Sequence, residues 1–281
     1  MPTWDEFARA LPRATARATT GLVKEAGWVA THLATYPLGL LADRGPRPRH
    51  GLAGLSVEQR GLAHRDLTAA GTPILLVHGI VDNHTIFNPL RRALDRRGFA
   101  QISSFDYGLL TSDVVRTAAR LGTVIEELTE QTGYERLHVI GHSLGGLLAR
   151  YYVQRLGGDE RVHTLVTLGT PHQGTELARI GSAFPLVRQL RPDSTLMRTL
   201  AEPAPDCSTR FVCFHSDLDQ LVVPSRNARL IHPDLDVTNV TVPGVGHLSL
   251  TNHRGIAAQI AELLSEIEPH CSSPAPTQRL G

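Results

Sequence analysis

The chain has 281 residues, of which 41% are hydrophobic and 20% are charged, a balance typical of a folded globular protein rather than of a disordered one. Its 28 basic and 27 acidic residues give a net charge of +1, so the sequence lacks the electrostatic signature of a nucleic-acid-binding protein. No apolar run reaches the length of about 18 residues that a membrane-spanning helix needs. The first 20 residues contain no apolar segment of the kind found in signal peptides. These features favour a protein that is cytoplasmic or peripherally associated with a membrane, and they leave secretion open if the sequence lacks its native start.

Residues 1–70 are predicted to be an N-terminal helical extension. Pro37 is expected to kink or end its helix, because proline lacks a backbone donor. The helical face would pack on the main domain or on a second copy, or it would form a surface over residues 22–40 that contacts lipid. Apolar residues recur there at steps of three and four, as in an amphipathic helix: Leu22, Ala26, Val29, Leu33, Tyr36 and Leu40.

Residues 71–268 are predicted to form the main domain, followed by a polar, proline-containing tail at 269–281 that is expected to be disordered. Strands that alternate with helices require crossover connections, which predicts an α/β fold with a mostly parallel sheet and helices on both faces. The expected strands lie at 73–78, 101–105, 137–140, 164–168, 210–215 and 237–242, and the expected helices at 88–97, 112–132, 147–156 and 255–267.

The three cysteines are too few and too scattered for a disulfide framework or a zinc site. They are Cys207, Cys213 and Cys271. Two interpretations stay open, namely free thiols in a reducing compartment and a single Cys207–Cys213 bridge in a secreted protein.

Residues 141–146 read Gly-His-Ser-Leu-Gly-Gly, which matches the pattern G-x-S-x-G. A serine that points out of a tight turn between a strand and a helix has a strained backbone, and side chains two residues before and after it would collide, so both positions favour glycine. The pattern alone is weak, but here an expected strand precedes it and an expected helix follows. Ser143 is therefore the predicted nucleophile.

A serine hydroxyl needs a base, and that base needs an orienting acid. In this kind of turn the chain order is serine, acid, histidine, so the base is expected after Ser143. His247 lies in the glycine-punctuated loop Pro-Gly-Val-Gly-His after the last strand and is the predicted base. The later histidines with other predicted places are His215 at a strand end, His232 in a loop and His253 as an exposed cap.

The acid is expected after the next-to-last strand, where two aspartates compete. Asp219, which is followed by the apolar Leu-Val-Val-Pro, is favoured over Asp217. Spacing alone cannot measure which carboxylate reaches Nδ1 of His247, because only geometry decides it.

Negative charge that develops on a substrate carbonyl oxygen needs hydrogen-bond donors. In this architecture one donor is the backbone N–H after the nucleophile, here Leu144, and the other comes from the loop after the first strong strand. Ile80 follows His78-Gly79 in that loop and supplies the second predicted donor. A plain turn at a strand end would also explain His78-Gly79.

These motifs, together with Gly169-Thr-Pro-His-Gln-Gly-Thr, resemble those of bacterial triacylglycerol lipases and esterases of the α/β-hydrolase fold over roughly residues 72–267. The resemblance implies Ser143 as nucleophile, Asp219 as acid and His247 as base, with the N–H groups of Ile80 and Leu144 as oxyanion donors. Residues 176–209 leave room for a short cap of one or two helices. Larger lipases of this group often bind a structural calcium, but this sequence offers no aspartate cluster for one.

The predicted function is hydrolysis of carboxylic esters, such as acylglycerols, by a serine hydrolase of lipid metabolism that requires no metal or organic cofactor. A thioesterase, phospholipase or acyltransferase would use the same triad. A noncatalytic binding module on the same fold is a third hypothesis, which the presence of all three triad residues disfavours. The expected partner is a small-molecule or lipid ester and not a nucleic acid.

Overall fold

The computed structural model describes residues 67–80, 82–108, 113–180 and 184–265. The amphipathic pattern at 22–40, the tail at 269–281 and Cys271 lie outside the described residues. Within this part of the chain no helix is long and apolar enough to cross a membrane.

Six strands form one sheet in which every neighbouring pair is parallel, which confirms the predicted sheet. The order is β2-β1-β3-β4-β5-β6, so the chain moves outward from β1 in one direction and then in the other. Such a reversal leaves a crevice at the carboxyl ends of the central strands. The strands are β1 (Ile74–Val77), β2 (Ile102–Phe105), β3 (Leu137–His142), β4 (Val162–Leu168), β5 (Arg210–His215) and β6 (Asp236–Thr241).

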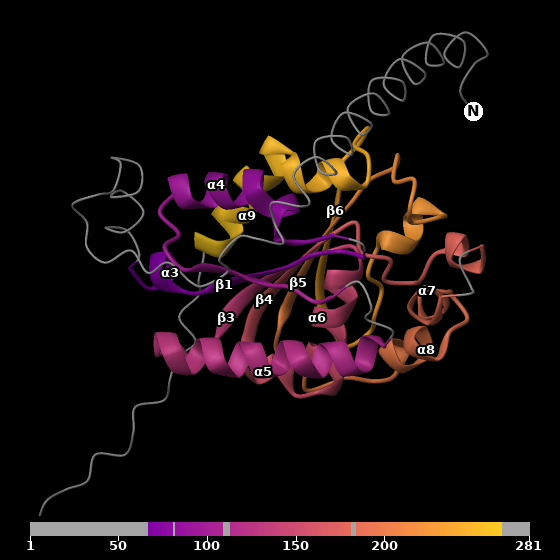
Figure 1. Ribbon diagram of the computed structural model, residues 1–281, viewed down its shortest axis with the longest axis horizontal. Coiled ribbons are helices and arrows are strands. Elements are labelled where there is room, and N and C mark those ends of the chain that lie inside the picture. The colour runs from indigo at the N-terminus through magenta and orange to yellow at the C-terminus, as the bar shows by residue number, and fades with distance from the viewer. Residues whose placement is uncertain (1–66, 81, 109–112, 181–183, 266–281) are drawn as a thin grey trace, which may run out of the picture.

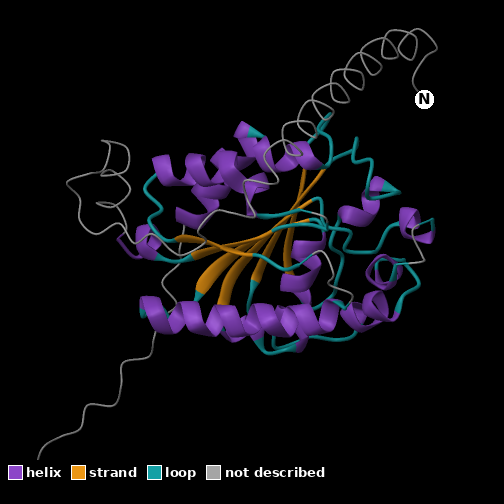
Figure 2. Ribbon diagram, in the orientation of Figure 1, coloured by secondary structure: helices purple, strands orange, loops and turns teal. Residues whose placement is uncertain are grey.

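Helices cover both faces of the sheet (Figures 1 and 2). On one face α4 (Asn88–Arg96) packs against α9 (Arg254–Ser265), and α3 (Leu67–Gly71) also contacts α9. On the other face α5 (Val114–Thr132) packs against α6 (Leu144–Arg155). The predicted layers of an α/β fold are thus confirmed.

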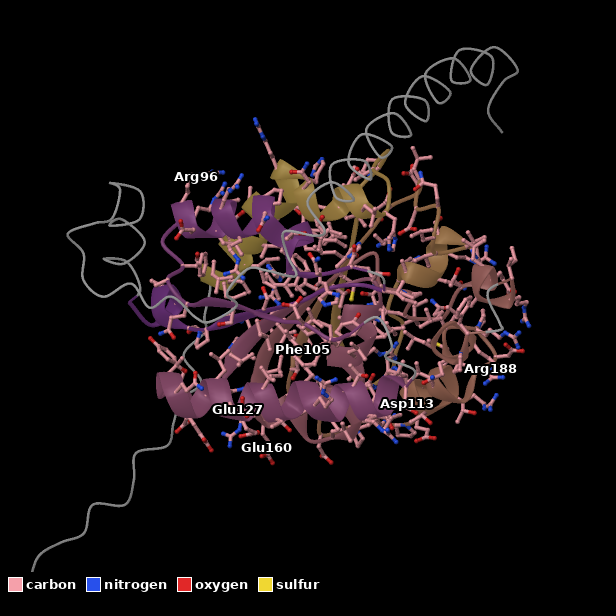
Figure 3. The ribbon with its side chains drawn as sticks, in the orientation of Figure 1. Arg96, Phe105, Asp113, Glu127, Glu160 and Arg188 are labelled. Atoms are coloured by element: carbon pink, nitrogen blue, oxygen red, sulfur yellow. The ribbon has the colours of Figure 1, made fainter. Side chains whose placement is uncertain are left out.

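Each face of the sheet has its own apolar core, because successive side chains of a strand point to opposite sides. In β1, Leu75 and Val77 belong to the core under α5 and α6, whereas Ile74 and Leu76 belong to the core under α4 and α9. Phe105 at the end of β2 is likewise interior, while charged residues such as Glu127 line the outer surface (Figure 3). A strand buried on both faces must be apolar at every position, as β1 is.

The sequence predicted a short cap in the segment between β4 and β5, and this segment is helical. It contains a 3₁₀ helix (Glu176–Arg179), α7 (Pro185–Gln189) and α8 (Thr195–Ala201). Ser194 is the N-cap of α8: its Oγ accepts a hydrogen bond of 3.2 Å from the Met197 N–H, and such a cap stabilises the first turn of a helix. The two helices lie together at one end of the molecule (Figure 1).

The two described cysteines are free thiols, so the Cys207–Cys213 bridge that the sequence left open is not formed. Cys213 lies in β5 and is completely buried. Burial raises the pKa of its thiol to about 11, because a thiolate loses its hydration in the core. Cys213 is therefore a core residue held as a neutral thiol.

Candidate active site

The turn at Ser143 joins a strand directly to a helix. Strand β3 runs two residues further than predicted, to His142, and α6 begins at Leu144, so Ser143 alone connects them. Its backbone has φ 52° and ψ −120°, and among the described residues it is the one non-glycine residue with a positive φ. Such a conformation costs roughly 1–3 kcal/mol and persists only where the surroundings enforce it.

The glycines around Ser143 are required by close contacts. A Cβ atom on Gly141 would lie 2.5 Å from Cα of Gly146, and one on Gly145 would lie 2.1 Å from the carbonyl oxygen of Val77. Both contacts involve backbone atoms, which cannot rotate away as a side chain would. The steric reason that the sequence suggested for these glycines is therefore present.

Asp219 and His247 form a buried pair. The Nδ1 atom of His247 lies 2.7 Å from Oδ2 of Asp219, and the two side chains are 1% and 0% exposed. Because a carboxylate only accepts hydrogen bonds, Nδ1 carries the proton and Nε2 of the neutral ring has the free electron pair. This is the tautomer that a general base needs.

The charge state of Asp219 suits this pairing. Burial raises the pKa of Asp219, but the charge and hydrogen bond of His247 and two backbone donors outweigh burial, so the net pKa lies below its usual value. The donors are the N–H groups of Leu221 and Val222, at 2.9 and 2.8 Å from Oδ1. Asp219 is therefore ionised at neutral pH and oriented through both of its oxygens.

The competing aspartate, Asp217, has a different contact. It is exposed, and its Oδ1 accepts a hydrogen bond of 2.7 Å from the Gly244 N–H. The neighbouring Ser216 Oγ accepts one of 3.3 Å from the Val245 N–H. Asp217 and Ser216 thus accept hydrogen bonds from the loop that leads to His247, while Asp219 contacts the imidazole ring of His247.

The His247 ring lies beside the elements that carry Ser143. A Cβ atom on Gly169 would lie 3.1 Å from Cε1 and Nδ1 of His247, and Gly169 follows Leu168, whose carbonyl accepts a 2.9 Å hydrogen bond from the Ser143 N–H. The ring of His142 lies 4.9 Å from that of His247. The serine, aspartate and histidine therefore follow the carboxyl ends of β3, β5 and β6, the edge of a parallel sheet where ligands commonly bind.

His142 makes a contact that the sequence gave no reason to expect. Its Nε2 lies 3.3 Å from the carbonyl oxygen of His247 and donates to it, and its Nδ1 lies 3.5 Å from Oδ2 of Asp82. The side chain is almost fully buried. Its place directly before Ser143 was the one available sequence signal, and that place alone does not reveal a contact to a residue 105 positions later.

The two predicted oxyanion donors belong to segments next to Ser143. Leu144 is the first residue of α6, where backbone N–H groups have no partner within the helix. A Cβ atom on Gly79 would lie 3.1 Å from Cβ of Ser143, so the residue before Ile80 lies against the serine. The Ile80 side chain packs against the core under α5 and α6.

The three later histidines have structural partners away from this pair. His215 ends β5 and its Nε2 lies 3.0 Å from Thr241 Oγ1, while His232 Nε2 lies 3.0 Å from the carbonyl oxygen of Glu202. His253 precedes α9, and its Nδ1 accepts a hydrogen bond from the Ile256 N–H. Among the described residues, no cluster of three or more histidine, cysteine, aspartate or glutamate side chains could hold a metal ion.

Comparison with known proteins agrees with this architecture. A family model described as the alpha/beta hydrolase fold matches residues 72–188. The chain has the α/β-hydrolase fold. The structure of the lipase BlEst2 of Bacillus licheniformis in mature form matches this chain with a TM-score of 0.60 and 16% identity, over 78% of this chain and 96% of the other. Lipase B of Aspergillus fumigatus matches with a TM-score of 0.62 and 16% identity, over 81% of this chain and 58% of the other.

Two curated relatives are similar in sequence over part of their length. A triacylglycerol lipase of Pseudomonas fragi is 33% identical over 121 residues, which is 40% of this chain and 39% of the relative. One of Burkholderia plantarii is 29% identical over 140 residues, 47% of this chain and 38% of the relative. The chain therefore spans less than half the length of either relative that it matches. The predicted resemblance to bacterial lipases and esterases of this fold is confirmed.

Proposed function

We propose that this α/β hydrolase is a serine hydrolase that cleaves carboxylic esters, as a lipase or esterase of acylglycerols or similar aliphatic esters. The observation that carries the proposal is the buried 2.7 Å contact between His247 and Asp219 beside a serine held at φ 52°. The similarity to proteins named triacylglycerol lipases supports the choice of ester substrate.

In the proposed mechanism, Nε2 of His247 takes the proton of Ser143 while Oγ attacks the ester carbonyl carbon. The ionised Asp219 stabilises the imidazolium that forms. Collapse of the tetrahedral intermediate expels the alcohol, which receives the proton from His247, and leaves an acyl-serine. A water that gives its proton to His247 then attacks the acyl-serine, and the carboxylic acid leaves as Ser143 regains its proton.

The oxyanion of each tetrahedral intermediate would accept hydrogen bonds from the N–H groups of Leu144 and Ile80. Removing one such donor lowers the rate by about 10²–10³-fold in a well-studied serine protease. The close approach of Gly79, the residue before Ile80, to Ser143 supports this assignment.

Exposed apolar side chains near this region support an aliphatic substrate. Leu221 and Val223 follow the proposed acid and are partly exposed, and Ile180 and Phe184 in the cap segment are 85% and 69% exposed. The Thr175 Oγ1 joins the two regions, because it donates to the Leu221 carbonyl and accepts from the Val223 N–H, both at 2.9 Å. Exposed apolar surface of this kind favours binding of an apolar molecule.

The test compares Ser143→Ala with the wild type on a series of 4-nitrophenyl esters of increasing acyl length. Loss of the nucleophile should lower kcat by on the order of 10⁴–10⁶-fold. The matched control is Ser208→Ala, which removes an exposed serine before the amino end of β5 and should leave the rate unchanged. Full activity of Ser143→Ala would reject the proposal, and the dependence on acyl length separates a lipase from a short-chain esterase.

We also propose lipid contact through residues 22–40, which rests on their amphipathic pattern alone. Deletion of residues 1–45 should then lower binding to phospholipid vesicles while turnover of a soluble ester is retained. A loss of stability or yield without a change in vesicle binding would instead indicate that the helix packs on the protein.

A further inference from the structure

His78 contacts the peptide that carries one of the two proposed oxyanion donors. Its Nδ1 lies 2.9 Å from the carbonyl oxygen of Gly79, and the contact is buried. A carbonyl oxygen only accepts, so Nδ1 carries the proton. We propose that His78 is a positioning residue: by holding the Gly79 carbonyl, it directs the Ile80 N–H toward the oxyanion that forms at Ser143. This inference rests on the proposed function.

The geometry of the peptide group links the Gly79 carbonyl to the Ile80 N–H. In a trans peptide the C=O and the following N–H point in opposite directions, so the group that fixes the Gly79 oxygen also fixes the direction of the Ile80 N–H. Gly79 itself restrains the backbone little, since glycine has the widest choice of conformations. Without a partner for its carbonyl, this peptide could rotate and turn the donor away from Ser143.

The His78 ring is held in place by Tyr107. The two rings are stacked, with centroids 4.3 Å apart and planes at 9°. The Tyr107 hydroxyl donates a 2.8 Å hydrogen bond to the His78 carbonyl, and the Tyr107 N–H donates to His78 Nε2 at 3.4 Å. Because Nε2 accepts here, the ring is in the neutral form with its proton on Nδ1, as the contact to Gly79 requires.

The charge state of His78 is consistent with this role. Burial lowers the pKa of His78, although the contact with Gly79 and the charges of Asp106 and Asp82 oppose the shift. The ring is therefore neutral at neutral pH. Protonation would add a proton at Nε2, which lies 3.4 Å from Oδ1 of Asp106, and would leave the Nδ1–H in place. The orienting hydrogen bond is thus available in both charge states.

The bond to the Gly79 carbonyl also strengthens the donor. Hydrogen bonds in a chain polarise one another, so a peptide whose oxygen accepts a bond donates more strongly through its nitrogen. If the turn at Gly79 only reversed the chain, stronger donation by the Ile80 N–H would have no consequence for the reaction. The proposed role therefore differs from a structural one in its consequence for charge at the oxyanion.

The test uses His78→Leu, which removes the donor, and His78→Asn, whose side-chain amide can place an N–H close to the position of Nδ1. Each variant and the wild type are assayed on a carboxylic ester and on the thionoester in which sulfur replaces the carbonyl oxygen. Sulfur accepts hydrogen bonds poorly, so the ratio of the two rates measures how strongly the donors hold the oxyanion. Melting temperatures are recorded for all three proteins.

We expect His78→Leu to lower kcat for the ester by about 10–10²-fold, with a small change in KM and a lower ratio of ester to thionoester rates. His78→Asn should recover most of both quantities. An unchanged ester-to-thionoester ratio in His78→Leu, whether or not kcat falls, would overturn the inference, because a purely structural role does not act selectively on the oxyanion.

One further variant, His78→Gln, keeps the test decisive if His78→Leu does not fold. His78→Gln carries the same amide as His78→Asn but places it at the position of Nε2, away from the Gly79 carbonyl. We expect a lower ester-to-thionoester ratio for His78→Gln than for His78→Asn, and equal ratios would overturn the inference. A wild-type protein that hydrolyses no ester would instead refute the proposed function, so the two failures are distinguishable.

Discussion

His138 gives a stability prediction with a calculable size. It lies in β3, is 1% exposed, and neither ring nitrogen has a hydrogen-bond partner among the described residues. Burial is the largest cause that lowers its pKa, and His163 and Arg136 lower it further, from 6.5 to about 3. The folded protein therefore holds this ring neutral under conditions in which the unfolded chain protonates it.

The sign of the pH dependence follows from proton binding. Below pH 6.5 the unfolded state binds a proton at His138 that the folded state does not bind until the pH approaches 3, so the protein loses stability as the pH falls through this range. One pKa unit corresponds to about 1.4 kcal/mol. Between about pH 7.5 and about pH 5 the loss from this single residue is therefore about 2 kcal/mol.

The perturbation is His138→Leu, which fills similar space without a titratable group. Urea unfolding of both proteins gives the free energy of unfolding at the two pH values. Relative to the wild type, the variant should gain about 2 kcal/mol at the lower pH beyond its difference at the higher pH. The matched control is Ile140→Val in the same strand, whose cost of about 0.5–1.5 kcal/mol should not depend on pH. A pH-independent difference for His138→Leu would refute the account of a buried neutral ring.

Two further predictions concern the site and the turn that carries it. Asp219→Asn should lower kcat on a soluble ester by about 10⁴-fold, because the amide favours the wrong tautomer of His247. In the control Asp217→Asn the amide oxygen can still accept the hydrogen bond from the loop, so kcat should fall by less than about tenfold. Similar losses of kcat in the two variants would contradict the assignment of roles. Gly145→Ala would place a methyl group 2.1 Å from the backbone oxygen of Val77, so urea unfolding should show a loss of about 3 kcal/mol or more, and wild-type stability would show that this contact is absent.

The sequence predicted the layers of the fold well, because local patterns determine them. Apolar runs between turn residues located all six strands, and the run at 210–215 coincides with β5. The strand that leads to Ser143 differs from its predicted bounds: the prediction ended it at residue 140, whereas β3 continues through Gly141 and His142. Neither residue resembles a strand residue in isolation, and it is the pairing with β4, where His142 lies opposite Leu168, that keeps them in the sheet.

The contacts of the site were less accessible from the sequence. Local motifs singled out Ser143 and His247, but two aspartates two residues apart have the same local context. The path of the loop decides between them, because it brings Asp219 to the ring and leaves Asp217 at the Gly244 N–H. In the same way, the hydrogen bond from His78 to Gly79 depends on side-chain rotation, which residue spacing does not encode.

The central claim is that Ser143 becomes acylated during ester hydrolysis. The most direct test is to quench the wild-type protein with acid during turnover of a slowly deacylated ester and to map the acyl group by peptide mass spectrometry. The account predicts the acyl group on the peptide that contains Ser143, and none on that peptide in Ser143→Ala. Ester turnover with the acyl group on another residue, or with no acyl-enzyme at any stage, would contradict it.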